Sequence, residues 1–152
     1  MRLRGNVPFY RLVALALRAT LELALARLVL HRTKPADVLR RNALSTRAAA
    51  AAGSAMPDEA AARRCDEVAS VISAMALRVP WRADCLVQAL AGQRWLLKDR
   101  IESKIVIGTA KKQDGAFEAH AWLLQGANVI LGGDITRFET LLDPELTRIR
   151  TH

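Results

Sequence analysis

The spacing of hydrophobic residues along the chain changes once, from a helical period to an alternation that is typical of strands. Residues 10–31 carry apolar side chains three or four positions apart, which predicts a long amphipathic helix largely covered by the rest of the domain. Residues 57–79 and 83–98 show the same period and predict two further helices. Residues 104–110 and 117–124 are rich in β-branched or aromatic residues and predict strands.

Shorter signals complete this pattern. Pro35 is expected to open a short helix, PADVLRRNAL. The alanine-rich residues 45–57 that follow fit either a surface loop or a frayed helix. Residues 129–133 predict a third strand that leads into Asp134. Helices first and antiparallel strands afterwards indicate an α+β fold.

The length of 152 residues fits one domain with a sizeable core. We expect a helical N-terminal part over residues 1–56, a core over residues 57–142 and a tail over residues 143–152.

The chain has a net charge of +8, and its arginines are dispersed rather than gathered in one tract. This favours an acidic partner surface or peptide, and the scarcity of aromatic residues argues against nucleic acid. Arg18, Glu22 and Arg27 interrupt the apolar N-terminal run, so we predict neither a signal peptide nor a membrane-spanning helix. Arg18 and Glu22 are spaced to pair on one helical face. Peripheral membrane association is the alternative for this helix.

The two cysteines predict different roles. Neither shows metal-ligand spacing, so we expect a reduced, cytoplasmic protein without metal or cofactor. Cys65 lies on the apolar stripe of its helix, which is typical of a buried core residue. Cys85 falls in the first turn of the helix that Asp84 is predicted to cap. Unpaired N–H groups there stabilise a thiolate and can bind an oxyanion, although a plain structural role for Cys85 is the alternative.

A histidine on the second strand, His120, is the candidate base, and a packed or surface residue without a catalytic role is the alternative for it. His120 would take the thiol proton and later protonate the leaving group. If the third strand stays regular, Asp134 shares a face with residues opposite His120 and is the carboxylate in reach to orient its ring. Asn128 is the alternative orienting residue. A second alternative is that Asp134 is a plain turn residue at the exit of the strand and has no catalytic role. Trp122 shares the face of His120, where it either shields the ring or belongs to the core.

Three motifs in order carry a resemblance to a known family: CLVQAL at the start of a helix, Ile107-Gly108 in the next strand, and AHAW at residues 119–122. Together they resemble the lasso-peptide B proteins, transglutaminase-like cysteine proteases that remove the leader from a lasso-peptide precursor. The resemblance covers roughly residues 78–142. It implies a papain-like core with Cys85 as nucleophile and His120 as general base and acid. The family's orienting aspartate lies about a dozen residues past the histidine, where this chain has Gly132, so Asp134 fits only with a longer hairpin loop.

The resemblance also implies partners. Because the N-terminal part predicts helices and no strands, the chain resembles the stand-alone protease form, which depends on a separate leader-recognition protein. The substrate would be a leader–core precursor peptide, and an asparagine-synthetase-like cyclase would receive the freed amine. Gln88 is a further candidate to assist in oxyanion binding. The alternatives are a transglutaminase-like amidase or acyl transferase acting on another peptide, and a catalytically silent interaction domain of the same fold.

Overall fold

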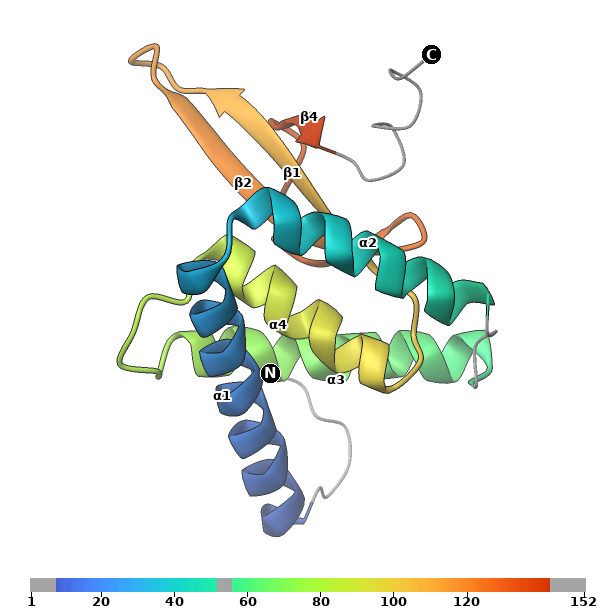
Figure 1. Ribbon diagram of the computed structural model, residues 1–152. Helices are drawn as coiled ribbons and strands as arrows, with labels where there is room; N and C mark the ends of the chain where they lie inside the picture. The colour runs from blue at the N-terminus through green and yellow to red at the C-terminus, as the bar shows by residue number, and fades with distance from the viewer. Residues whose placement is uncertain (1–7, 52–55, 143–152) are drawn as a thin grey trace.

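The computed structural model describes residues 8–51 and 56–142 of the chain. In these ranges, helices come first and an antiparallel sheet follows, which confirms the predicted α+β class (Figure 1). The predicted tail over residues 143–152 lies outside the described residues. The elements are α1 (Phe9–Arg32), α2 (Pro35–Ala51), α3 (Asp58–Ala76), α4 (Cys85–Lys98), β1 (Lys104–Lys111), β2 (Phe117–Gln125), β3 (Asn128–Leu131) and β4 (Glu139–Leu142).

The sheet has the strand order β3-β2-β1-β4, and its strands pair in antiparallel fashion. β1 and β2 form a long hairpin in which Gly108 lies opposite His120, and the tip of this hairpin extends beyond the helices (Figure 1). β4 was not predicted from the sequence. It pairs with β1 on the far side of the sheet from β3, so the segment between Leu131 and Glu139 must cross the sheet.

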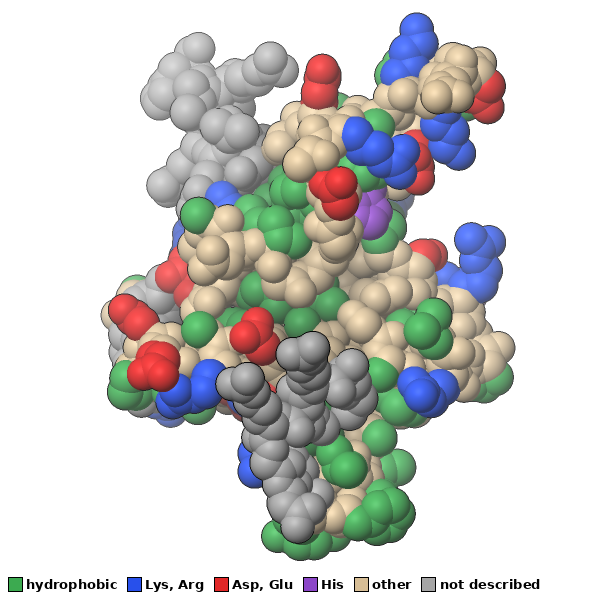
Figure 2. All heavy atoms as spheres, turned by 180° about the vertical axis from the view of Figure 1, so that it is seen from behind, with side chains coloured by type: hydrophobic (Ala, Val, Ile, Leu, Met, Phe, Trp, Pro, Cys, Tyr) green, Lys and Arg blue, Asp and Glu red, His purple; other side chains and the backbone are tan. Residues whose placement is uncertain are grey.

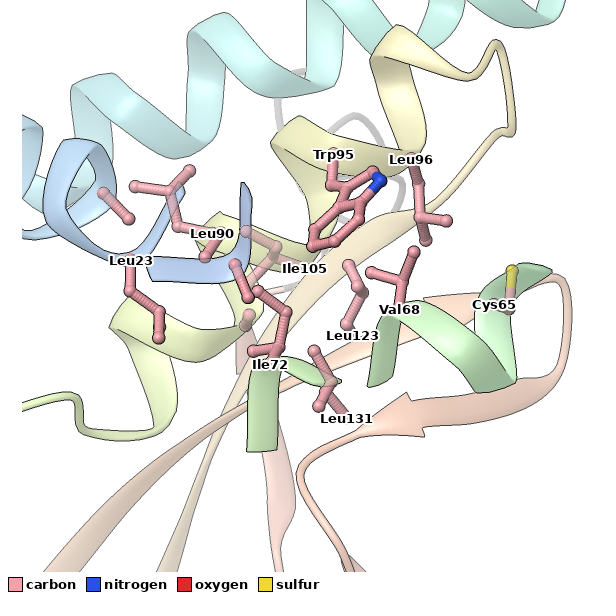
Figure 3. Close-up of a cluster of buried hydrophobic side chains, with 14 of the residues drawn as sticks. Leu23, Cys65, Val68, Ile72, Leu90, Trp95, Leu96, Ile105, Leu123 and Leu131 are labelled. Carbon is pink, nitrogen blue, oxygen red and sulfur yellow. The ribbon is translucent and has the colours of Figure 1, made fainter. Parts of the chain in front are cut away.

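Helix α4 lies at the centre of the core and is buried on nearly all sides. It packs against α1, α3 and β2, and the side chains of Leu90, Trp95 and Leu96 point into the cluster between the helices and the sheet (Figure 3). More than one face of this helix is buried, because Val87 and Ala91 are covered in addition to Ala89 and Leu90. Burying each large side chain contributes about 1.5–3 kcal/mol. This burial fixes the position of α4, and with it the position of the residues at its N-terminus.

Ion pairs fix α1 to the end of α4. Glu22 is almost fully buried and pairs with Arg94 and Lys98. Arg18 reaches Asp99, with 3.3 Å between its Nη2 and the Oδ1 of the carboxylate. The predicted pairing of Arg18 with Glu22 is therefore wrong, because tertiary packing offers each residue a partner on the α4 side.

The opposite face of α1 is exposed. It carries large apolar side chains at helical spacing, and hydrophobic side chains gather at the lower end of the molecule, where α1 begins (Figure 2). The expectation that the rest of the domain largely covers this helix is thus fulfilled on one face alone. None of the described helices combines the length and hydropathy needed to cross a membrane. The exposed apolar residues of α1 are Phe9, Tyr10, Val13, Leu17, Leu21 and Leu28.

Helix α2 is longer than its sequence signals indicated. It continues from Pro35 through the alanine-rich segment to Ala51, so the helical alternative for that segment is confirmed up to this residue. Alanine has the highest helix propensity, which outweighs the absence of a strong apolar stripe.

Candidate active site

Cys85 is the first residue of α4, and the local sequence explains this position. Asp84 is the N-cap, with an extended backbone, and its Oδ1 accepts a hydrogen bond from the N–H of Val87 at 3.3 Å. The predicted cap is therefore confirmed. Gln88 donates from its side-chain amide to the carbonyl of Ala83 at 2.7 Å, which fixes the segment that leads into the helix. The half-buried Cys85 thus sits where helical N–H groups lack intrahelical acceptors.

His120 lies in β2 and its ring is held on two sides. The Nε2 atom is 2.7 Å from the carbonyl oxygen of Gly132. Because a carbonyl can only accept, Nε2 must carry the hydrogen in this contact, which leaves Nδ1 as the unprotonated nitrogen of the neutral ring. Phe138 stacks on the ring, with 4.8 Å between the ring centroids, and Trp122 lies 6.2 Å away by the same measure.

The structure brings Cys85 and His120 to one small cavity of about 240 Å³. The cavity lies where the start of α4, the strand β2, the exit of β3 and the helix α3 meet. Cys85 and His120 thus border the same space, although one comes from a helix and the other from a strand. The remaining lining residues are Ser73, Gln88, Gly132 and Gly133.

Asp134 is not among the residues that line this cavity. β3 ends at Leu131, and the positive φ angles of Gly132 and Gly133, 120° and 66°, turn the chain away from a strand. The assumption of a regular strand as far as Asp134 is therefore wrong. The exposed Asp134 carboxylate accepts hydrogen bonds from the N–H and the hydroxyl of Thr136, at 3.0 and 2.7 Å. These bonds lower the pKa of Asp134 below its ordinary value.

The other sequence candidates lie elsewhere. Asn128 is at the opposite end of β3 and lines a larger groove of about 800 Å³, formed with α2 and the start of α3, that contains neither Cys85 nor His120. We place the candidate site at the smaller cavity because a cysteine and a histidine both line it, and these two residue types can act as a nucleophile and a base. Cys65 is buried in α3, as predicted, and burial raises the pKa of its thiol to about 11.

Sequence reasoning missed three parts of this site. Ser73 lies on α3, next to the buried Ile72, and no motif marked it. Phe138 and the carbonyl of Gly132 come from the segment that crosses between β3 and β4. The one available signal was the position of Gly132, twelve residues past the histidine, where the resemblance implied an orienting group.

A cysteine that opens the central helix and a histidine on an antiparallel strand, both lining one cavity, are typical of transglutaminase-like thiol enzymes. Among protein-family models, that of the transglutaminase-like superfamily matches residues 28–143, and the chain belongs to this superfamily. Its members are usually cysteine peptidases or acyl transferases. Comparisons with curated proteins and with solved structures returned no significant match.

Proposed function

We propose that the protein is a cysteine peptidase that removes the leader from a lasso-peptide precursor. The observation that carries this proposal is the shared cavity of Cys85 and His120 at the start of α4. The superfamily match supports a thiol enzyme, and the motifs at Cys85, at Ile107-Gly108 and at residues 119–122 support the lasso-peptide assignment.

The chemistry follows from the two nitrogens of His120. Since Nε2 faces the Gly132 carbonyl, Nδ1 is the nitrogen that exchanges a proton with the Cys85 thiol. The thiolate attacks the carbonyl carbon of the last leader residue, and the resulting imidazolium protonates the amine of the departing core peptide. Water, deprotonated by the same ring, then hydrolyses the thioester. The sum is one peptide bond and one water consumed, and one carboxylic acid and one amine formed.

The first turn of α4 supports the oxyanion of each tetrahedral intermediate. The N–H of Val87 is bonded to the cap, whereas the N–H of Cys85 belongs to a turn in which helical N–H groups lack intrahelical acceptors. The positive end of the helix dipole acts in the same direction and stabilises the thiolate as well.

The same proposal extends to partners. The described residues contain no strand before β1 at Lys104, which fits a protease that depends on a separate leader-recognition protein. The net charge of +8 suits an acidic leader or an acidic face on that protein. The freed core amine would pass to an asparagine-synthetase-like cyclase, and the setting would be the cytoplasm.

The decisive experiment is cleavage of a leader–core precursor encoded beside the gene, with its recognition protein present, followed by mass spectrometry. Wild-type protein and Cys65→Ala should release a leader with a free C-terminal carboxylate, and Cys85→Ala should release none while keeping the same circular dichroism spectrum. Retained cleavage by Cys85→Ala would exclude the proposed nucleophile.

The acyl-transferase alternative is separated in the same assay by adding hydroxylamine or a primary amine. A transferase would place the amine on the leader terminus at low amine concentration, whereas a peptidase would still deliver the acid. A silent interaction domain would show neither product.

A further inference from the structure

If Cys85 and His120 have the roles proposed above, another group must hold the His120 ring in its orientation. In thiol and serine hydrolases, an acid or amide side chain usually fixes the ring of the base. Here the position that the resemblance assigns to an aspartate is Gly132, and the carbonyl of this residue lies 2.7 Å from Nε2 of His120.

We propose that the main-chain carbonyl of Gly132 is the orienting acceptor for His120, and that Asp134 acts only by shaping the loop that presents this carbonyl. The catalytic machinery would then be a cysteine–histidine pair held by backbone, without a carboxylate at the ring.

The backbone at Gly132 admits no side chain. Its φ of 120° lies in the region that glycine alone adopts without strain, and a Cβ placed there would be 2.4 Å from the Cβ of Trp122 and 3.0 Å from its Cα. Glycine is therefore required for the close approach of this loop to β2. This close approach places the Gly132 carbonyl oxygen within hydrogen-bond distance of the His120 ring. A residue with a side chain at position 132 could not come this close.

The loop beyond Gly132 is fixed by contacts that do not involve the histidine nitrogens. Asp134 accepts both of its bonds from Thr136. Arg137 pairs with Glu118 of β2, with 3.0 Å between Nη1 and Oε2. The next residue, Phe138, then stacks on His120. Asp134 therefore stabilises the turn through Thr136, whereas the Gly132 carbonyl and the Phe138 ring contact the His120 imidazole directly.

This arrangement predicts a small effect of removing the Asp134 charge. In a triad, replacing the orienting carboxylate by its amide lowers turnover about 10⁴-fold. The Gly132 carbonyl accepts the Nε2–H bond without a negative charge, and the Asp134 carboxylate is bonded to Thr136 instead. Removing the charge of Asp134 therefore leaves the contact to Nε2 in place. Asp134→Asn keeps an acceptor for Thr136 and should change the reactivity of Cys85 by no more than about threefold, as an exposed loop substitution does.

The test uses iodoacetamide as the probe on full-length protein in a Cys65→Ala background, so that Cys85 is the one thiol that reacts. The alkylation rate is measured across pH for the parent, for Asp134→Asn and for Asp114→Asn. Asp114 is a matched control, because it also is exposed and accepts a hydrogen bond from the N–H two residues later, at the distant tip of the hairpin. We expect the three profiles to coincide. A shift of the profile midpoint by about one pH unit or more in Asp134→Asn alone would overturn the proposal.

A second readout examines the ring directly. Nitrogen-15 spectra of His120 in the wild-type protein, at a pH where the ring is neutral, should show the Nε2–H tautomer, and Asp134→Asn should show the same. An Nδ1–H tautomer, or a change of tautomer in the variant, would refute the role of the Gly132 carbonyl. Neither measurement needs a peptide substrate. A failure to cleave the precursor would therefore count against the proposed function alone. The role of the Gly132 carbonyl is tested separately, by the alkylation profiles and the tautomer of His120.

Discussion

The two cysteines differ enough in their surroundings to predict which one reagents will modify. Cys65 is 3 % exposed, and desolvation by burial, followed by the nearby charge of Asp66, raises the pKa of its thiol from the ordinary 9.0 to about 11. At about pH 8, two units of pKa reduce the thiolate fraction about a hundredfold, and the thiolate is the reactive form. Cys85 is half-buried at a helix N-terminus and borders an open cavity.

The assay is a time course with iodoacetamide at about pH 8, with the products counted by intact-mass spectrometry. Wild-type protein should gain one adduct that peptide mapping places on Cys85, and the adduct on Cys65 should form at least about a hundred times more slowly than it does in the unfolded chain. Cys85→Ala should stay unmodified over the same period, and protein unfolded in urea should gain two adducts rapidly. Comparable rates for both thiols in the folded protein would refute the physical reasoning, since they would mean that Cys65 is neither desolvated nor shielded.

Three other measurements follow from the same structure. The folded protein keeps the Cys65 proton to a higher pH than the unfolded chain does. The contribution of Cys65 to the free energy of unfolding should therefore be fully present below about pH 9. It should then fall by about 2–3 kcal/mol as the pH approaches 11, and urea titrations should find no such decline for Cys65→Ala. Asp84→Ala removes the cap acceptor for Val87 and should cost about 1 kcal/mol in thermal or urea unfolding, whereas Asp84→Asn should cost much less. Glu22→Gln removes the buried negative charge between Arg94 and Lys98 and should lower the free energy of unfolding by about 1–3 kcal/mol, and an unchanged urea midpoint would contradict this estimate.

The sequence by itself determined the features that depend on near neighbours in the chain. Asp84 predicted the start of α4, because a side-chain cap bonds N–H groups two or three residues away. The start of α3 and the hairpin of β1 and β2 followed from a proline, acidic first-turn residues and β-branched alternation. The position of Cys85 in a first turn, and thus its suitability as a nucleophile, was also a local property.

Tertiary structure decided which residues that are distant in sequence contact one another, and the sequence did not predict these contacts. The glycine pair before Asp134 did allow a strand exit, and the structure confirms that alternative, because β3 stops at Leu131 and Gly132 and Gly133 both have positive φ angles. The close packing of Gly132 against Trp122, which accompanies this turn, was not readable from the sequence. Pairing of β4 with β1, the stacking of Phe138 and the approach of Ser73 all join residues that are distant in sequence. The sequence therefore determined which side chains carry the chemistry, whereas the fold decided that a backbone carbonyl meets the histidine, since such contacts depend on long-range register that no local pattern encodes.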